Sequence, residues 1–153
     1  MKRLIIVSVL SIFMFVYLNA QENSNGKTIT SFSELNVGIA QLTSEYDVFP
    51  GVSYLWGKTV VDENNFIVEY EAGFALPTII TGKVGIGKKF DNTHVIVGLR
   101  PYPFNLYFQA SLMSGNKGYW IMSVEYNPVG SDSFIFFESR ALFNIGYRWY
   151  LNK

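Results

Sequence analysis

The sequence predicts an all-β protein, an eight-stranded antiparallel up-and-down transmembrane β-barrel, and three observations predict this class. Apolar and polar residues alternate through most of the chain after residue 30, as in strands with two unlike faces. Most alternating segments are about 10–12 residues long, and a tilted strand needs ~9–11 residues to cross a bilayer. Aromatic residues make up 17% of the chain and charged residues only 16%, whereas soluble domains contain about 25% charged residues.

Composition excludes several classes of function. A chain of 153 residues allows one domain and hardly two. It has no cysteine, so disulfides, thiolate metal sites and a cysteine nucleophile are excluded, and its single histidine excludes a metal site of several histidines. Twelve Lys and Arg balance twelve Asp and Glu, which leaves no basic surface for nucleic acid. We therefore expect no cofactor, no metal and no nucleic-acid partner.

The N-terminus is typical of a secretory signal peptide. A cationic start, Met-Lys-Arg at 1–3, precedes an apolar run at 4–18 that only two serines interrupt. We expect residues 1–20 to be the signal peptide, with cleavage after Ala20. The alternative is a retained membrane anchor, which usually needs about 20 apolar residues.

Alternation then defines the first half of the barrel. In the third segment, every second residue from Phe66 on is apolar, whereas Glu69 and Glu71 lie on the other face. Turn residues at 62–64 and Pro77 separate the segments. We expect strands at 34–42, 50–61, 65–76 and 78–89, preceded by a periplasmic segment at 21–33.

The second half continues the same pattern. Every second residue from Phe104, and again from Ala141, is apolar, and turn residues lie at 91–92 and 114–118. The longest connection is 128–138. We expect strands at 94–101, 104–113, 118–127 and 139–151, so the barrel domain spans 34–153.

The two strand faces differ in a way that favours a membrane barrel. The apolar face is rich in aromatic residues, and within the strands only Lys58 and Lys88 interrupt it. The polar face holds the charged residues and seven glycines, small enough for a narrow interior: Gly38, Gly57, Gly73, Gly85, Gly87, Gly98 and Gly146. In a soluble lipocalin-like barrel, the apolar face would line the interior and bind an apolar ligand, and the polar face would point to solvent. That is the main alternative.

Turn positions set the pairing of charged residues on the polar face. A hairpin centred on Pro77 places Glu71 opposite Lys83. The two-residue turn at 91–92 then places Lys83 opposite Arg100. The later hairpins and the closing seam give three further pairs: Arg100 with Asn105, Tyr107 with Glu125 and, at the opposite end of the barrel, Arg148 with Glu34.

These pairs predict a lumenal charge network. One interpretation is an ion path or a proton-linked gate. The other is a plug of paired charges, because interior charges need partners of opposite sign in any such barrel. We favour the plug, and its expected members are Glu34, Glu69, Glu71, Lys83, Arg100, Glu125 and Arg148.

The last strand carries a resemblance to a known family. Asn144, Gly146, Trp149 and Leu151 match the C-terminal assembly signal of bacterial outer-membrane barrels: a polar residue, a glycine two positions later, and aromatic or apolar residues three and five beyond it. The mature chain resembles the small eight-stranded OmpA/OmpX-type barrels. The resemblance implies a monomer in the outer membrane of a Gram-negative-type envelope, delivered by the barrel-assembly machinery, with both termini in the periplasm.

The expected function is a structural or surface-interaction role without enzymatic activity. The external connection at 128–138 is the candidate interaction loop, because its residues Phe134, Ile135, Phe136 and Phe137 are unusually apolar for a loop. The alternative is that these residues only extend the last two strands beyond the membrane. A lipid-modifying barrel enzyme is a further alternative. His94 is its only candidate histidine base, and no serine accompanies it on its strand face, so we expect a hydrogen-bonding role at the turn.

Overall fold

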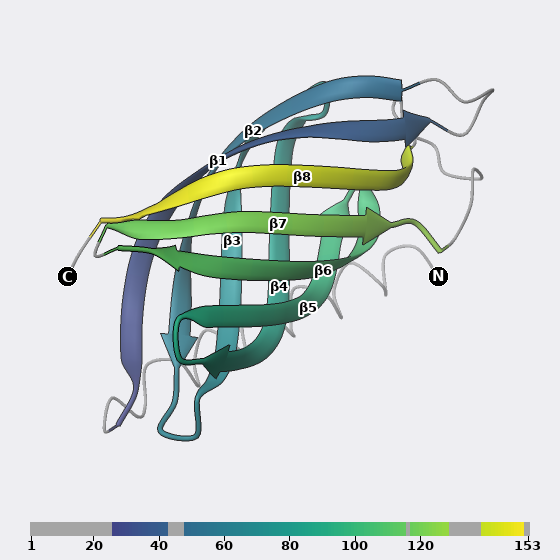
Figure 1. Ribbon diagram of the computed structural model, residues 1–153. Coiled ribbons are helices and arrows are strands. Elements are labelled where there is room, and N and C mark those ends of the chain that lie inside the picture. Colours follow the sequence, from purple (N-terminus) through teal and green to yellow (C-terminus); the bar gives the residue numbers. More distant parts are fainter. Residues whose placement is uncertain (1–25, 43–47, 116, 129–138, 152–153) are drawn as a thin grey trace.

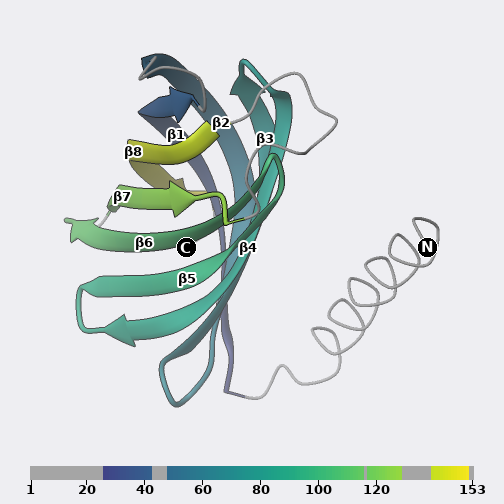
Figure 2. The same ribbon diagram turned by 90° about the vertical axis from the view of Figure 1, so that its right-hand side faces the viewer.

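The computed structural model describes residues 26–42, 48–115, 117–128 and 139–151. These residues form eight antiparallel strands, each hydrogen-bonded to the next, and β8 pairs with β1 to close a barrel (Figures 1 and 2). The fold class predicted from the sequence, an eight-stranded antiparallel barrel, is confirmed. The strands are β1 (Thr28–Leu42), β2 (Val48–Val61), β3 (Phe66–Leu76), β4 (Ile79–Phe90), β5 (Thr93–Tyr102), β6 (Phe104–Ser114), β7 (Gly118–Tyr126) and β8 (Ser139–Tyr150).

Seven of these strands begin and end within two residues of the predicted bounds. The exception is β1, which begins at Thr28 rather than at residue 34, so residues 28–33 belong to the barrel and not to a preceding segment. Hydroxyl residues dominate this stretch, and its two apolar side chains, Ile29 and Phe32, point to opposite faces. Pairing with β2 therefore extends the strand where alternation gives no signal.

The barrel has an apolar outer face and a polar interior. In β6, for example, Phe108 is 51% exposed, whereas its neighbour Gln109 is fully buried. The same alternation holds along β3 and β7. The orientation predicted from the two strand faces is confirmed in the described residues. No helix long and apolar enough to cross a membrane is found among them.

Glycines on the inner face make room for larger side chains. A Cβ atom at Gly98 would lie 2.7 Å from a ring carbon of Tyr107, and one at Gly85 would overlap the hydroxyl of the same residue. Tyr107 is buried and packs with Ile67 and Ile96 in a small apolar cluster. The two glycines thus let a full tyrosine ring occupy a narrow lumen.

One irregularity interrupts the β4–β5 pairing. Gly82 pairs with Tyr102, but Val84 pairs with Leu99, so the register shifts by one residue at Lys83. Such a β-bulge places one residue of a strand opposite two of its neighbour and re-aims nearby side chains. From Val84 to Phe90 the ladder follows the register expected from the turn at 91–92.

Candidate functional site: a buried charge network

Seven charged side chains from six strands converge inside the barrel. Each is at most 6% exposed, and opposite charges lie in direct contact. They are the seven residues that the sequence predicts: Glu34 (β1), Glu69 and Glu71 (β3), Lys83 (β4), Arg100 (β5), Glu125 (β7) and Arg148 (β8). We call this set the lumenal charge network.

Arg148 is the centre of one half of the network. Its Nε donates to Glu34 Oε2 at 2.7 Å, while Nη1 and Nη2 donate to the two carboxylate oxygens of Glu69 at 2.5 and 2.8 Å. Its guanidinium lies over the ring of Phe32, 3.6 Å from the centroid. Because the guanidinium is planar, it engages a carboxylate with two donors while it stacks on an aromatic face.

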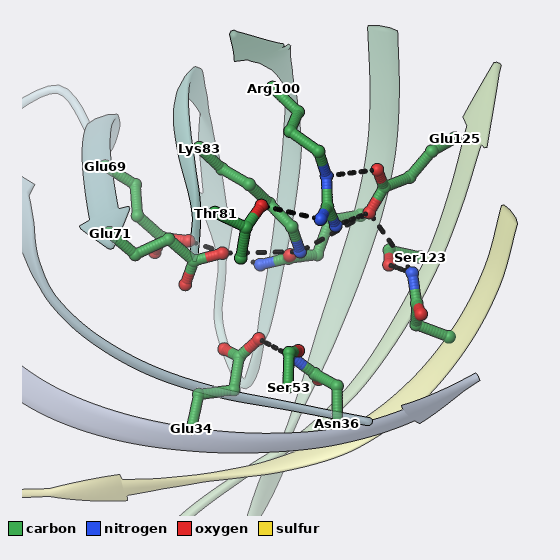
Figure 3. Close-up of polar contacts among 12 residues, drawn as sticks. Glu34, Asn36, Ser53, Glu69, Glu71, Thr81, Lys83, Arg100, Ser123 and Glu125 are labelled. Atoms are coloured by element: carbon green, nitrogen blue, oxygen red, sulfur yellow. Dashed lines mark hydrogen bonds and ion pairs between the residues drawn. The ribbon is translucent and has the colours of Figure 1, made fainter. Parts of the chain in front are cut away.

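Lys83 and Arg100 organise the other half, shown in Figure 3. The ammonium of Lys83 lies 3.3 Å from Glu71 Oε1 and 3.6 Å from Glu125 Oε1, so it extends between the two carboxylates. Arg100 donates two hydrogen bonds to Glu125, at 2.7 and 2.6 Å, and a third to the hydroxyl of Thr81 at 2.7 Å. Glu125 is therefore held by two cations.

Neutral side chains add hydrogen bonds to three of the four carboxylates. Asn36 donates to Glu34 at 2.8 Å, and the hydroxyl of Thr59 donates to Glu69 at 2.8 Å. Gln109 and Asn144 donate to Glu69 and Glu125 at 3.2 and 3.1 Å, respectively. These hydrogen bonds offset part of the cost of removing the charges from water. Within the described residues, Oε1 of Glu71 has an ionic contact with Lys83 but no hydrogen bond.

The network holds one more acid than base. Four carboxylates (Glu34, Glu69, Glu71 and Glu125) face three cations (Lys83, Arg100 and Arg148), which leaves one negative charge if all are ionised. The shortest ionic contact of Glu71 is 3.3 Å, to Lys83, whereas each of the other three carboxylates has an ionic contact of 2.6 Å or less. The excess charge is therefore compensated least at Glu71.

Most of the predicted backbone pairs are confirmed. Glu71 pairs with Lys83, as the hairpin centred on Pro77 requires. The pairs Arg100–Asn105, Tyr107–Glu125 and Glu34–Arg148 also occur. The predicted Lys83–Arg100 pair is not a regular ladder pair, because the bulge places Lys83 opposite both Arg100 and Pro101. Both cations instead point at the same carboxylate, that of Glu125.

The predicted separation of Arg148 and Glu34 from the other charges is also wrong. Arg148 reaches Glu69 and Glu71 as well as Glu34, so the two groups form one continuous network. Strand pairing alone does not indicate this contact, because β8 and β3 are not neighbours. The available signal in the sequence was the long side chain of Arg148 on the last strand, together with Glu69 and Glu71 on one face of β3.

His94 forms the hydrogen bond expected for it. Its Nε2 lies 3.2 Å from the hydroxyl of Tyr119, and the two rings are 4.6 Å apart. Sequence reasoning missed Ser111, which is paired with His94 across β5 and β6 and is fully buried. Since Tyr119 occupies Nε2 and the serine is sealed from solvent, this pair does not present a nucleophile to a substrate. Within the described ranges, no group of acidic and histidine side chains is arranged to hold a metal ion.

The residues of the C-terminal pattern fall at the closing seam. Asn144 points inward and donates to Ser123 and Glu125. Gly146 abuts Asn36 and leaves no space for a Cβ atom. Trp149 is on the outer face, packed edge-on against Tyr147, and the exposed Leu151 donates its N–H to the Ser31 carbonyl at 2.9 Å.

Two further predictions lie outside the described residues: the signal peptide at 1–20 and the apolar loop residues Phe134, Ile135, Phe136 and Phe137.

No protein-family model, curated protein or solved structure matches this chain. The class of protein that its described residues define is a closed antiparallel barrel with an apolar exterior and ion pairs across its lumen.

Proposed function

We propose that the chain is an outer-membrane β-barrel protein with a structural or surface-interaction role and no enzymatic activity. The observation that carries the proposal is the inverted distribution of its side chains. Large apolar residues on every strand are 38–67% exposed, whereas the charged network is buried. An apolar exterior of this extent is unfavourable in water at about 25 cal/mol per Å² and favourable against acyl chains.

The outer face is also depleted of charge. Among the described strands, its charged side chains are Lys58 and Lys88, each a few residues from a short turn. A lysine near a membrane surface can extend its ammonium toward the headgroups. The strands contain 9–15 residues, enough for the ~9–11 residues that a tilted strand needs to span the hydrocarbon.

The interior supports a structural role rather than a wide pore. The Arg148–Glu69 and Lys83–Glu125 contacts join strands that are not neighbours in the ring, so they cross the lumen. They are the expected contents of a narrow barrel closed by a plug of paired charges. A gated ion path would require these contacts to open.

The alternatives fit the described residues less well. A soluble barrel for an apolar ligand needs an apolar interior, and here ion pairs occupy the lumen. A lipid-modifying enzyme needs an accessible nucleophile or base, and His94 and Ser111 are buried. The surface-interaction part of the proposal remains a prediction for the loop at 128–138.

The test combines fractionation with electrophoresis of the full chain expressed in a Gram-negative host. We expect it in the outer-membrane pellet, with a faster-migrating band in unheated samples that shifts on boiling. Purified protein in a planar bilayer should give no steady ohmic conductance. Recovery in osmotic-shock fluid, without a heat-dependent shift, would refute the membrane assignment, and stable conductance would refute the plug.

A further inference from the structure

A groove of about 500 Å³ crosses the outer face of the barrel. Its surface is almost entirely apolar, and it runs across neighbouring strands rather than along one of them. Its central outward residues are Trp56, Lys58, Tyr70, Ala72, Gly82 and Val84. Sites for small molecules and lipid chains usually measure about 300–1,000 Å³, so the groove has the size of a binding site.

Small residues form its floor. Trp56 pairs with Ala72, and Ala72 pairs with Gly82, so one row across three strands changes from a large ring to almost no side chain. A Cβ atom at Gly82 would lie 3.0 Å from the carbonyl oxygen of Glu71, so this part of the floor is backbone. The adjacent row, with Tyr70 and Val84, forms the opposite wall.

The two ends of the groove differ. At one end lie Ser31 and the exposed Leu151, with Lys58 beside them; Lys58 pairs with Ser31 and Tyr70, close to the turn that joins β2 and β3. At the other end the wall is Pro101, in the bulged part of the β4–β5 ladder. The groove is therefore an apolar channel with a cation at the end nearer the short turns, which is complementary to an acyl chain with an anionic headgroup.

We propose that this groove binds one acyl chain of an anionic phospholipid, with the phosphate beside Lys58. The inference rests on the proposed membrane location, because only then does the groove face lipid. Under that proposal, the end carrying Lys58 lies on the same side as the short turns and the chain termini, so the lipid belongs to the periplasmic leaflet. A small-residue floor lets the acyl chain lie closer to the strands than side chains elsewhere permit.

Trp56 supplies a local probe, since it lines the groove and is 45% exposed. The double variant Trp120→Phe/Trp149→Phe leaves Trp56 as the single tryptophan of the three in the chain. The protein is reconstituted in phosphatidylcholine vesicles containing equal small fractions of brominated phosphatidylglycerol or brominated phosphatidylcholine, whose bromines quench tryptophan on contact. We expect an apparent association about fivefold stronger for the anionic lipid, the factor that ~1 kcal/mol per lysine contact gives.

Three variants then separate the parts of the site. Lys58→Gln should abolish the preference while general quenching remains. Ala72→Phe should fill the floor and weaken quenching by both brominated lipids. The matched control, Ala110→Phe, places the same ring at an outward alanine of β6 outside the groove. It should change neither the lipid preference nor the extent of quenching. The reporter variant Trp56→Phe/Trp149→Phe, which reads Trp120, should show no lipid preference.

Equal quenching of Trp56 by the two lipids, or a preference that survives Lys58→Gln, would overturn the inference. So would the same preference at Trp120, because it would indicate general enrichment of anionic lipid. In each of these cases insertion itself is intact and the proposed function stands. Failure of every variant to associate with vesicles would instead refute both.

Discussion

Arg148 of β8 and Glu69 of β3 are joined by two hydrogen bonds although their strands are three places apart in the ring. The contact crosses the lumen and brings together residues 79 positions apart in sequence. Each carboxylate oxygen accepts one guanidinium donor, the strongest geometry for such a pair. The barrel is thus stabilised by an ion pair across its interior as well as by the backbone hydrogen bonds between its strands.

Lys83→Met should strongly destabilise the barrel. The substitution removes the ammonium between Glu71 and Glu125 and leaves buried carboxylates without that partner. Breaking a buried pair on one side costs about 3–5 kcal/mol. We expect a clearly lower melting temperature by circular dichroism in detergent, whereas Lys88→Met, on the outer face, should change stability by less than ~0.5 kcal/mol. An unchanged melting temperature for Lys83→Met would contradict the ionic contacts described for Lys83.

Glu71→Gln should be tolerated far better than Glu69→Gln. The first change removes the excess negative charge of the network and leaves three carboxylates facing three cations. The second removes charge from a carboxylate that Arg148, Thr59 and Gln109 all contact, and we expect a loss of several kcal/mol. Unfolding in urea with the two variants side by side measures the difference. Equal destabilisation would contradict the proposal that Glu71 is the least compensated acid.

Arg148→Lys should destabilise the barrel even though the charge is kept. A single ammonium cannot replace donors that bond Glu34 and both oxygens of Glu69 while stacking on Phe32. Each lost hydrogen bond to a charged group is worth about 1.5–3 kcal/mol. Arg140→Lys is the control, because Arg140 is exposed at the start of β8. If the two variants melt alike, the geometry of the guanidinium is unimportant.

Gly146→Val should prevent closure of the seam. A side chain at this inward position would overlap the Asn36 side chain and approach the carbonyl of Leu35. We expect a large fall in the fraction of chain that reaches the compact, heat-modifiable form during refolding into micelles. Ala141→Val, on the outer face of the same strand, should refold like the wild type. Normal refolding of Gly146→Val would contradict the steric requirement for a glycine at the seam.

The fold and much of the network were predictable because β-hairpins have few geometric freedoms. A turn at Pro77 and a side-chain period of two suffice to place Glu71 opposite Lys83. What the sequence could not predict depends on the closed ring. The bulge that places Lys83 opposite both Arg100 and Pro101 has no marker in the alternation. The Arg148–Glu69 contact depends on how far the strands are staggered around the barrel.

The extension of β1 to Thr28 illustrates a further limit. Ile29 and Phe32 fall on opposite faces, so the local pattern lacks the amphipathic signal of the later strands. The order there comes from the partner strand: Thr28 pairs with Val61 at the end of β2. Hydroxyl-rich strand ends of this kind are set by tertiary pairing rather than by their own sequence.

The position of Arg148 in the final strand has a consequence for how the molecule is completed. Until β8 arrives, Glu34 and Glu69 face an open sheet without the cation that neutralises them. A sheet without β8 therefore keeps an open hydrogen-bonding edge and lacks this cation, and pairing of β8 with β1 supplies both. Closure and neutralisation occur together, which favours an all-or-none product over incomplete barrels.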